Sequence, residues 1–358
     1  MVLRKINLLM LTRYSTMGAS SRLRSLDYIP YYEQAGISVT NAPLFDDEYI
    51  EELYNNKKRS KLKIIKSYVN RFKCLMKTRK YDVIFIEKEL FPFLPGPIES
   101  IITFLNVPYI IDYDDAIFHN YDMSENLIIR SLLSNKLSRL IKNSYCVTAG
   151  NSYLSNYAKK NGARNIEYIP TVVDIKRYNQ DEVDYLGELR LGWIGSPSTS
   201  NYLRLLWPVF EEINQDFNVK LVTIGAPLFD DCPIPLEQHE WTLETECDVL
   251  ATVHVGIMPL LPGPWEEGKC GYKLIQYMAS SRPVIASAVG ANIDIIDSSF
   301  GCLASTDEDW VRHIKSFILK PDLINTMGKI ARKEAELSYT RDVAAMKLTK
   351  IIIKAAER

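Results

Sequence analysis

The sequence predicts an α/β protein built from two Rossmann-like, doubly wound domains. Short runs of apolar and β-branched residues alternate with longer helical patterns in both halves of the chain. Strands separated by helices pair in parallel through crossover connections. The chain has 358 residues, more than one hydrophobic core usually serves, and its apolar fraction of 47% and charged fraction of 24% are typical of a soluble globular protein.

The first half of the chain contains six predicted strands. The opening segment MVLRKINLLMLTRYS has a short apolar run that ends in a polar loop without a small-residue cleavage site. It therefore indicates a first strand rather than a signal peptide. A helix over residues 21–36, closed by Gly36, leads to the second strand, and a long helix follows. The predicted strands are residues 6–11, 38–44, 81–88, 108–114, 144–150 and 166–170.

The second half restarts the same rhythm after a polar, irregular stretch. We place a first domain at residues 1–172, a linker at 173–188 and a second domain at 189–338. A terminal amphipathic helix at 339–358 is expected to pack back on the first domain. In proteins of this kind, ligands bind at the carboxyl ends of the strands. The predicted strands of the second domain are residues 189–195, 219–225, 254–260, 283–287 and 301–305.

Charge and cysteine content restrict the classes of function. Residues 1–172 carry 24 Lys and Arg against 17 Asp and Glu, and the remainder carries 19 against 27, so the positive half should face an anionic partner. The six cysteines contain no C-x-x-C pair, which argues against a disulfide framework or a zinc cluster and fits a reducing cytoplasm. No apolar run reaches the roughly 18 residues of a membrane-spanning helix.

The stretch EEGKCGYKLIQYMASSRPVIAS, residues 266–287, places two lysines beside a predicted helix start. Gly271 could open the helix, with Lys269 just before it and Lys273 in its first turn. Lysine at this position opposes the helix dipole, whereas a bound diphosphate would accept backbone N–H bonds and be neutralised by both ammonium groups. The alternative is that both lysines are solvated surface charges.

Residues 268–292, GKCGYKLIQYMASSRPVIASAVGAN, resemble the donor-site segment of glycosyltransferase family 4, the retaining enzymes of the GT-B fold. The resemblance extends to GASSRLRSLDYIPYYEQAGISV near the start, AGNSYLSNYAKKNGARNIEYIPTVVD at the end of the first domain, and LGWIGSPSTSNYL at the start of the second. It implies transfer of a sugar from a nucleoside diphosphate sugar. The donor-binding residues it implies are Ser196, Ser198, Thr199, Glu267, Gly268, Lys269, Gly271, Tyr272, Lys273 and Gln276.

Two departures from the family pattern affect this donor site. The family has a Glu, seven residues and a second Glu that hydrogen-bonds the ribose, and these positions fall on Gly268 and Gln276. Gln276 can still bond a diol, but without a charge. Many members also carry an Arg and a Lys after the first strand of the second domain, where GSPSTSN stands here. We infer that Lys269 and Lys273 take over that cationic role.

Three acids and a histidine follow a predicted strand of the first domain. Asp112, Asp114 and Asp115 cluster at its end, and His119 comes soon after. The cluster could bind a divalent cation or could be a solvated loop with a helix cap. The family commonly has a histidine that contacts the transferred sugar, and its position falls on Asp114. The catalytic candidates are therefore Asp114 and Asp115, with His119 as the alternative.

The first glycine loop supplies further candidates. Gly18 would allow close approach between strand and helix, and Arg22 would reach the donor diphosphate or an anionic acceptor. Arg24 is a similar candidate. For each arginine, a surface charge is an equal alternative.

Residues 55–81 carry eleven Lys and Arg and no acid. Apolar residues recur at helical spacing, which predicts either a packed helix with a solvated basic face or an interfacial contact with anionic lipid. A nucleic-acid partner is disfavoured because the whole chain is slightly acidic and has no recognised binding module. The apolar positions are Leu62, Ile65, Val69, Phe72 and Met76.

The resemblance therefore predicts a retaining, metal-independent glycosyltransferase with no cofactor beyond its nucleotide-sugar substrate. Its acceptor would be a glycan or a lipid-linked oligosaccharide, of the kind used in bacterial surface-polysaccharide synthesis. We expect a cytoplasmic protein that contacts the inner face of the plasma membrane peripherally. The alternatives are a nucleotide-sugar epimerase of the same shape and a degenerate, non-catalytic protein that binds a sugar nucleotide or glycan.

Overall fold

A computed structural model describes residues 5–54 and 60–358 and divides the chain into two compact units. Unit 1 comprises Met1–Thr171 with Arg341–Arg358, and unit 2 comprises Val172–Thr340. The stretch expected to be a linker, 173–188, belongs to unit 2, because Val173 and Tyr178 are buried in its core. The side chains of this stretch, rather than its polar composition, decide where it packs.

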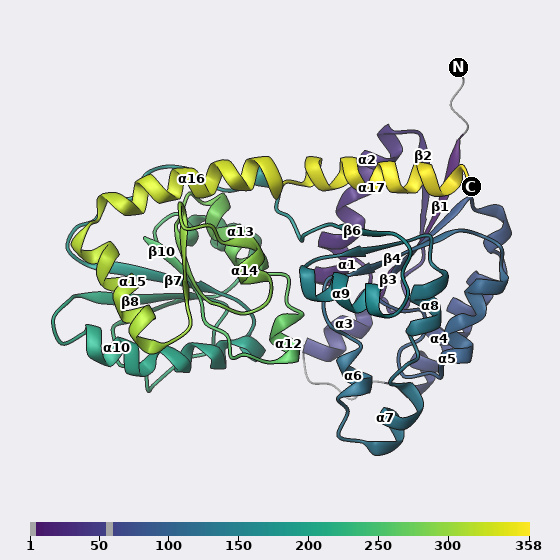
Figure 1. The fold of residues 1–358 in the computed structure, drawn as a ribbon, viewed down its shortest axis with the longest axis horizontal. Helices are drawn as coiled ribbons and strands as arrows, with labels where there is room; N and C mark the ends of the chain where they lie inside the picture. The colour runs from purple at the N-terminus through teal and green to yellow at the C-terminus, as the bar shows by residue number, and fades with distance from the viewer. Residues whose placement is uncertain (1–4, 55–59) are drawn as a thin grey trace. The chain divides into compact units, whose positions relative to one another are not determined.

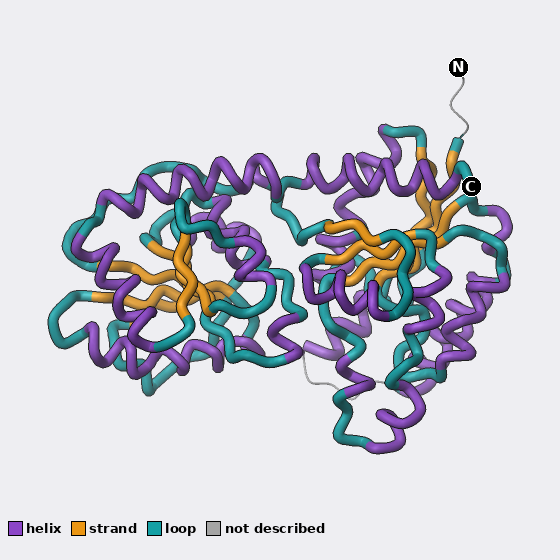
Figure 2. The backbone as a smooth tube through the Cα atoms, in the orientation of Figure 1, coloured by secondary structure: helices purple, strands orange, loops and turns teal. Residues whose placement is uncertain are grey.

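Unit 1 is a six-stranded parallel sheet in the order β2-β1-β3-β4-β5-β6, with helices packed around it (Figures 1 and 2). Chain order reverses between β1 and β3, which is the topological switch point of a doubly wound sheet. The strands are β1 (Ile6–Leu11), β2 (Ile37–Asn41), β3 (Val83–Glu87), β4 (Tyr109–Tyr113), β5 (Cys146–Ala149) and β6 (Ile166–Tyr168). The helices are α1 (Ala19–Arg24), α2 (Ile29–Gln34), α3 (Asp47–Tyr54), α4 (Lys61–Leu75), α5 (Gly96–Glu99), α6 (His119–Asp122), α7 (Leu127–Leu133), α8 (Ser138–Asn143), α9 (Ser152–Lys160) and α17 (Arg341–Ala356).

Unit 2 repeats this architecture with the order β12-β11-β10-β7-β8-β9, and its switch point lies between β7 and β10. The strands are β7 (Leu189–Ile194), β8 (Val219–Ile224), β9 (Leu236–His239), β10 (Val255–Met258), β11 (Val284–Ser287) and β12 (Gly301–Ala304). The helices are α10 (Trp207–Ile213), α11 (Leu243–Leu250), α12 (Pro264–Glu267), α13 (Tyr272–Ala279), α14 (Ala291–Ile295), α15 (Asp307–Leu319) and α16 (Asp322–Ser338). A long 3-10 helix, Pro197–Leu206, joins β7 to α10.

The predicted helix over residues 21–36 is broken into α1, a short 3-10 turn and α2. Ser25 ends α1 with φ −135° and ψ −62°, outside the helical region. Pro30 lies in the first turn of α2, where its missing N–H needs no helical partner. The sequence also gave no signal for β9, a half-buried strand with the polar sequence LEQH.

Of the two alternatives for the basic segment, helix α4 contradicts the one in which the apolar face packs inward. Its five regularly spaced apolar residues are 43 to 78% exposed, and the buried positions of the helix are Arg71 and Leu75. The Arg71 guanidinium donates to the carbonyl oxygens of Thr12 and Ala42, at 2.6 and 3.1 Å. Residues 55–59 of the basic segment lie outside the described residues.

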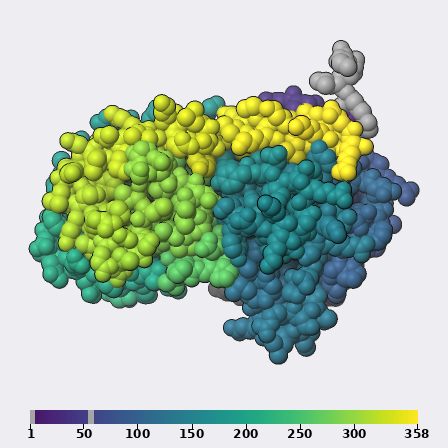
Figure 3. Space-filling view, viewed as in Figure 1, coloured from purple at the N-terminus to yellow at the C-terminus, as the bar shows by residue number. Residues whose placement is uncertain are grey.

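The C-terminal helix α17 belongs to unit 1 although it follows unit 2 in the chain. It packs against α2 and β3 and buries Leu348 and Ile352. Arg341 at its start forms an ion pair with Asp27 at 2.6 Å. Figure 3 shows this terminal segment, in yellow, at the surface of unit 1.

Candidate functional site

In unit 2, the sequence-predicted donor residues collect at the switch point of the sheet. One set lies in the loop after β7, residues 195–199, and the other lies between β10 and α13, residues 259–273. Because β7 and β10 are adjacent parallel strands, both loops leave the same edge of the sheet. Ligands of open α/β sheets bind at this kind of edge.

Gly271 starts α13 in the left-handed conformation, with φ 63° and ψ 22°. A Cβ at this position would clash with the Cδ1 of Ile295. Both the backbone conformation and the packing therefore require glycine. The following residue, Tyr272, is half-buried and packs against the core of unit 2. The turn starts an eight-residue helix, whose first N–H groups have no partner within the helix.

Lys273 links the two loops of this edge. Its Nζ donates to Thr199 Oγ1 at 3.3 Å and lies 4.3 Å from the centre of the Trp193 ring. A Cβ at residue 195 would lie 2.6 Å from that Nζ, so Gly195 leaves the space that the ammonium group fills. Burial, with a smaller contribution from Lys269, lowers the pKa of Lys273 to about 7. Among the described residues, no carboxylate lies within ion-pair distance of Lys273.

The hydroxyl loop is ordered by its own hydrogen bonds. Ser196 Oγ and Ser198 Oγ are 2.9 Å apart, and Thr199 Oγ1 donates to the Ser196 carbonyl oxygen at 3.0 Å. Ser196 and Ser198 are exposed. The loop therefore offers hydroxyl groups to solvent beside Lys273.

Lys269 lies on the same side as a tyrosine that the sequence analysis did not single out. Its Nζ is 5.8 Å from the centre of the Tyr202 ring, and the Tyr202 hydroxyl donates to Glu266. Glu267 ends α12 and is half-buried, and Gly268 is the buried residue that follows it. Two adjacent acids at the end of α12 are thus followed, after Gly268, by Lys269.

Gln276 belongs to a buried polar chain inside unit 2. Its Nε2 donates to the Tyr178 hydroxyl at 3.5 Å, and that hydroxyl donates to Glu246 Oε1 at 2.5 Å. Trp241 Nε1 donates to Glu246 Oε2 at 2.8 Å. No sequence pattern points to Tyr178, Trp241 and Glu246, because only the fold brings these separate segments to Gln276.

In unit 1, Asp114 lies at the end of β4 in a closed triangle with Lys88 and Ser20. The Lys88 ammonium is 2.9 Å from Asp114 Oδ1 and donates to Ser20 Oγ at 3.3 Å, and Ser20 Oγ donates to Asp114 Oδ2 at 2.6 Å. Burial alone would raise the pKa of Asp114, but Lys88, with Arg24 and Ser20, holds that pKa below its usual range. Lys88 directly follows β3 and adopts φ 65°, which is uncommon for a residue with a side chain.

The other two acids of the cluster have separate roles. Asp112 receives a bidentate pair of hydrogen bonds from Arg24, at 3.0 and 2.6 Å, and both side chains are buried. Asp115 Oδ1 accepts from the N–H of Ala116 at 2.9 Å. In the described ranges, no group of three or more His, Cys, Asp and Glu side chains is arranged to hold a metal ion. Arg24, a candidate for the binding site, is thus a buried partner of Asp112.

His119 lies in a hydrogen-bonded chain of its own. Its Nδ1 is 2.8 Å from Asp122 Oδ1, and its Nε2 is 2.8 Å from the Tyr153 hydroxyl. The imidazole is 8% exposed. The structure therefore joins His119 to α9 through Tyr153.

Gly18 and Arg22 flank the start of α1. Gly18 caps the helix with φ −75°, and a Cβ there would clash with Tyr14. The close approach expected at Gly18 is therefore made with the side chain of Tyr14. Arg22 is half-buried, and its backbone N–H donates to the Gly18 carbonyl oxygen at 2.9 Å.

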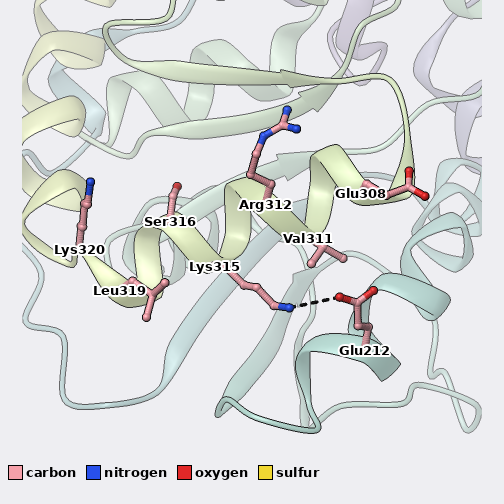
Figure 4. A pocket seen from close by; sticks show the side chains of 8 residues that line it. All are labelled: Glu212, Glu308, Val311, Arg312, Lys315, Ser316, Leu319 and Lys320. Atoms are coloured by element: carbon pink, nitrogen blue, oxygen red, sulfur yellow. Dashed lines mark hydrogen bonds and ion pairs between the residues drawn. The ribbon is translucent and has the colours of Figure 1, made fainter.

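A pocket of about 520 Å³ lies between α10 and α15 of unit 2 (Figure 4). Lys315 spans it to Glu212, with 3.2 Å between Nζ and Oε1. Arg312 is paired with Asp309 at 2.5 Å. The pocket shares no residue with the loops after β7 and β10, and its two pairs of opposite charges leave little net charge for a ligand. It is lined by Glu212, Glu308, Val311, Arg312, Lys315, Ser316, Leu319 and Lys320.

Comparison with solved structures identifies the architecture. HepE of Anabaena, solved in complex with UDP, is 12% identical and superposes with a TM-score of 0.69 over 98% of this chain and 100% of that one. The sucrose-phosphate synthase of Thermosynechococcus elongatus is 13% identical, with a TM-score of 0.69 over 98% of each chain. A glycosyltransferase of Rickettsia africae is 13% identical, with a TM-score of 0.69 over 99% of this chain and 100% of that one.

The fold is GT-B. Residues 188–319 match the family model described as Glycosyl transferases group 1, a range that includes the loops after β7 and β10. A comparison with curated protein sequences found no match. The family match and the GT-B fold together support a glycosyltransferase as the class of protein. Within the described part of the chain, every helix is too short or too polar to span a membrane.

Proposed function

We propose that the chain is a retaining glycosyltransferase, of the family 4 type, that transfers a hexosyl group from a nucleoside diphosphate sugar to a hydroxyl group. The observation that carries the proposal is the Lys273 ammonium group. It lies between the hydroxyl loop and the first turn of α13, against Trp193, without a carboxylate in ion-pair range among the described residues. A half-buried cation at a helix N-terminus is unfavourable until an anion joins it.

A diphosphate fits this position. It would accept hydrogen bonds from the first N–H groups of α13 and from Ser198 and Thr199, and it would be neutralised by Lys269 and Lys273. The HepE structures with UDP and with UDP-glucose support a nucleotide sugar as the ligand class. Because two ammonium groups supply the positive charge for the departing diphosphate, we propose that transfer needs no metal ion.

The ribose would lie towards Gln276, which occupies the position of the family's second glutamate. Its amide is held by Tyr178, which is in turn fixed by Glu246. These hydrogen bonds orient the Gln276 amide without placing a charge at the ribose. The base and the sugar of the donor would be selected by neighbouring groups of unit 2.

In unit 1, Asp114 is the carboxylate we propose to stabilise positive charge that develops at the anomeric carbon. Its ion pair with Lys88 and its bond from Ser20 hold it ionised and fixed in direction. A carboxylate paired in this way is a weak nucleophile, which favours attack from the same face as the leaving group over a covalent glycosyl-enzyme. Asp115 and His119 remain the alternative catalytic groups, and Arg22 the alternative diphosphate contact.

We propose a glycan or lipid-linked acceptor, with the protein acting in the cytoplasm at a membrane surface. WaaG, described as a glycosyltransferase involved in lipopolysaccharide biosynthesis, is 11% identical with a TM-score of 0.65, and it supports this acceptor class by fold alone. The excess of positive charge in the first 172 residues also fits an anionic surface.

The test is thermal unfolding of the full chain with UDP, GDP, ADP, TDP and CMP, each in EDTA and in manganese. A ligand that binds only the native state raises the unfolding temperature by mass action. We expect one diphosphate to stabilise the protein in EDTA. Lys273→Ala should weaken its binding by about 10- to 150-fold, as expected for loss of a charge-assisted hydrogen bond. Lys329→Ala, which removes an exposed lysine of the same unit, is the matched control.

A shift that requires manganese would contradict the metal-free donor site. Two rival functions are separated by product analysis once the donor base is known. An epimerase would convert the donor sugar without any acceptor. A non-catalytic binding protein, which the replacement of two family acids by Gly268 and Gln276 favours, would leave every donor and acceptor pair unchanged.

A further inference from the structure

Helix α4 presents its apolar stripe to solvent. The side chains are 43 to 78% exposed: Leu62 78%, Ile65 59%, Val69 46%, Phe72 43% and Met76 62%. Their spacing of three and four residues places them on one side of the helix. Five large apolar residues exposed in one line exceed the single, scattered apolar residues that are normal on a protein surface.

Lysines border this stripe on its outer side. Lys66 is four residues after Leu62 and three before Val69, and Lys73 is four residues after Val69, so each lies beside the apolar side chains on the helix surface. Lys61, Lys66, Lys73 and Lys77 are all exposed. In the part of the chain that the structure describes, no acid pairs with any of these four, whereas Lys63 pairs with Glu48 and Glu52 at 2.7 and 3.1 Å.

The inner side of α4 is fixed firmly to unit 1. Arg71 is 3% exposed and bonds two backbone carbonyl oxygens, and the Tyr68 hydroxyl donates to the Pro92 carbonyl oxygen at 2.8 Å. The helix therefore cannot rotate its apolar stripe into the core without breaking these bonds. The stripe is a permanent surface of unit 1.

A second exposed apolar group adjoins this helix. Phe93 follows Pro92, whose carbonyl oxygen accepts the hydrogen bond from Tyr68. Phe93 is 54% exposed and has a left-handed backbone with φ 58°. The Phe93 N–H donates to the Tyr121 hydroxyl at 3.1 Å, and the two rings are 5.5 Å apart. Tyr121 belongs to α6, and the next helix exposes Leu127, Ile128 and Leu132 by 67, 68 and 67%.

We propose that α4, with Phe93 as its neighbour, docks unit 1 onto an anionic lipid bilayer. The stripe would enter the boundary between headgroups and acyl chains, and the four unpaired lysines would bind lipid phosphates and carboxylates. Charge complementarity selects this partner, because an apolar stripe bordered by cations matches the two layers of an anionic membrane surface. A nucleic acid would match the lysines but would leave the apolar side chains in water.

The experiment is flotation of the full chain with phosphatidylcholine vesicles. The vesicles contain either no phosphatidylglycerol or about 30% of this anionic lipid, which gives their surface a negative charge. We expect binding to the anionic vesicles only, and weaker binding at high salt because surface charges are screened. Ile65→Ser with Phe72→Ser tests the apolar stripe, and Lys66→Glu with Lys73→Glu tests the cations. Each pair should lower the partition coefficient at least tenfold.

The control variants are matched in chemistry and lie elsewhere. Leu319→Ser removes an apolar side chain that is 67% exposed in unit 2, and Lys347→Glu with Lys350→Glu reverses two exposed lysines of α17. Both controls should bind like the wild type. The substituted α4 positions are exposed, so unfolding temperatures should stay close to the wild-type value.

Two results would overturn the proposal. One is equal binding of wild type and both α4 variants to the anionic vesicles. The other is a wild-type dimer in light scattering that the Ile65→Ser, Phe72→Ser variant converts to a monomer without change in vesicle binding, because the stripe would then be an interface between copies of this chain. Neither readout depends on glycosyl transfer, so failure of the proposed enzymatic activity would leave this result interpretable.

Discussion

Lys273 carries the most specific prediction at the scale of single residues. Burial lowers its pKa to about 7, so the free protein loses this positive charge as the pH rises above 7. A bound diphosphate stabilises the ammonium form and must therefore restore the proton. We expect nucleoside diphosphate affinity to fall by about tenfold for each pH unit above 7, the slope for uptake of one proton. Titration calorimetry between pH 7 and 9 in buffers of different ionisation enthalpy measures both the affinity and the proton.

The Lys273→Met variant supplies the control for this pH dependence. It should bind the nucleotide weakly and with little change between pH 7 and 9. The same group affects stability in the opposite direction. Because the unfolded chain binds the Lys273 proton up to its ordinary pKa and the native protein does not, the free energy of unfolding of the unliganded wild type should rise between pH 7 and 10 relative to Lys273→Met. A parallel pH dependence for the two proteins would contradict the position we assign to this ammonium group.

Lys88 gives a second prediction at this scale. Lys88→Met leaves the Asp114 carboxylate buried without its cation, which should reduce the free energy of unfolding at pH 7 by about 3–5 kcal/mol. The wild-type pKa of Asp114 is low, so its stabilising contribution is present above the unfolded pKa and is lost as the pH falls through the folded one. In Lys88→Met that pKa rises, and the loss of stability relative to wild type should shrink as the pH is lowered from 7 to 4.

Chemical denaturation across this pH range makes the comparison. The double variant Lys88→Met, Asp114→Asn should regain much of the stability lost at pH 7, because it buries no unpaired charge. A double variant as unstable as Lys88→Met alone would mean that Lys88 acts through packing or through its left-handed backbone.

Local sequence was sufficient to predict the helix start at Gly271, because a glycine before an apolar run marks a helix start directly, and the phosphate-binding role of Lys269 and Lys273 stays a prediction. It was not sufficient for Trp193, Tyr178 or Glu246. These residues come from separate segments, and only strand pairing and helix packing bring them to the α13 segment. Lys88 had a usable signal, since it directly follows a buried strand that neighbours the one ending at Asp114.

At the scale of elements, the start of α13 gives a test of the packing at the proposed donor site. Gly271→Ala places a Cβ in a left-handed position and against Ile295, so we expect a loss of about 2–4 kcal/mol from backbone strain and overpacking together. Gly187→Ala is the matched control, because Gly187 has φ 91° and no atom within 4 Å of the added Cβ. Backbone strain alone should reduce the free energy of unfolding of Gly187→Ala, by about 1–2 kcal/mol. Urea denaturation of both variants makes the comparison, and equal losses would contradict the packing role of Ile295.

At this scale, buried strands were easier to predict than a half-buried edge strand. Apolar β-branched runs marked β1, β3, β4, β7, β8, β10 and β11 because these strands are buried almost throughout. The edge strand β9 is half-buried along its length and carries a polar sequence, so periodicity gave no signal. The exposed stripe of α4 shows the converse, since helical spacing of apolar residues predicted a face without revealing which way it points.

At the scale of the whole molecule, the chain passes between its units twice, at 171–172 and at 340–341. The alternation of strands and helices predicted two α/β domains, and the GT-B fold confirms that class. The polar composition of residues 173–188 suggested a linker, but a segment can be polar on average and still bury the few side chains, such as Val173 and Tyr178, that attach it to a core. Composition alone does not distinguish a linker from a polar segment that buries a few side chains.

The topology predicts that unit 2 is separable and that unit 1 is not. Unit 2 is continuous from Val172 to Thr340, and its two ends meet, because Val173 forms a β-bridge with Thr340 and its N–H donates to the Tyr339 carbonyl oxygen at 3.1 Å. We therefore expect a fragment of residues 172–340 to fold cooperatively and to bind the same nucleoside diphosphate as the full chain, as measured by thermal unfolding and calorimetry.

Removal of α17 tests the other half of this prediction. A chain ending at residue 340 keeps all of unit 2 but exposes the surface of α2 and β3 that α17 covers, and it loses the ion pair between Arg341 and Asp27. Its unit 1 should unfold at a lower temperature, while the transition that responds to nucleotide stays where it is in the full chain. If truncation shifted both transitions equally, or if the isolated fragment of unit 2 failed to fold, the two units would have to be one cooperative structure in which α17 stabilises the donor site as well as unit 1.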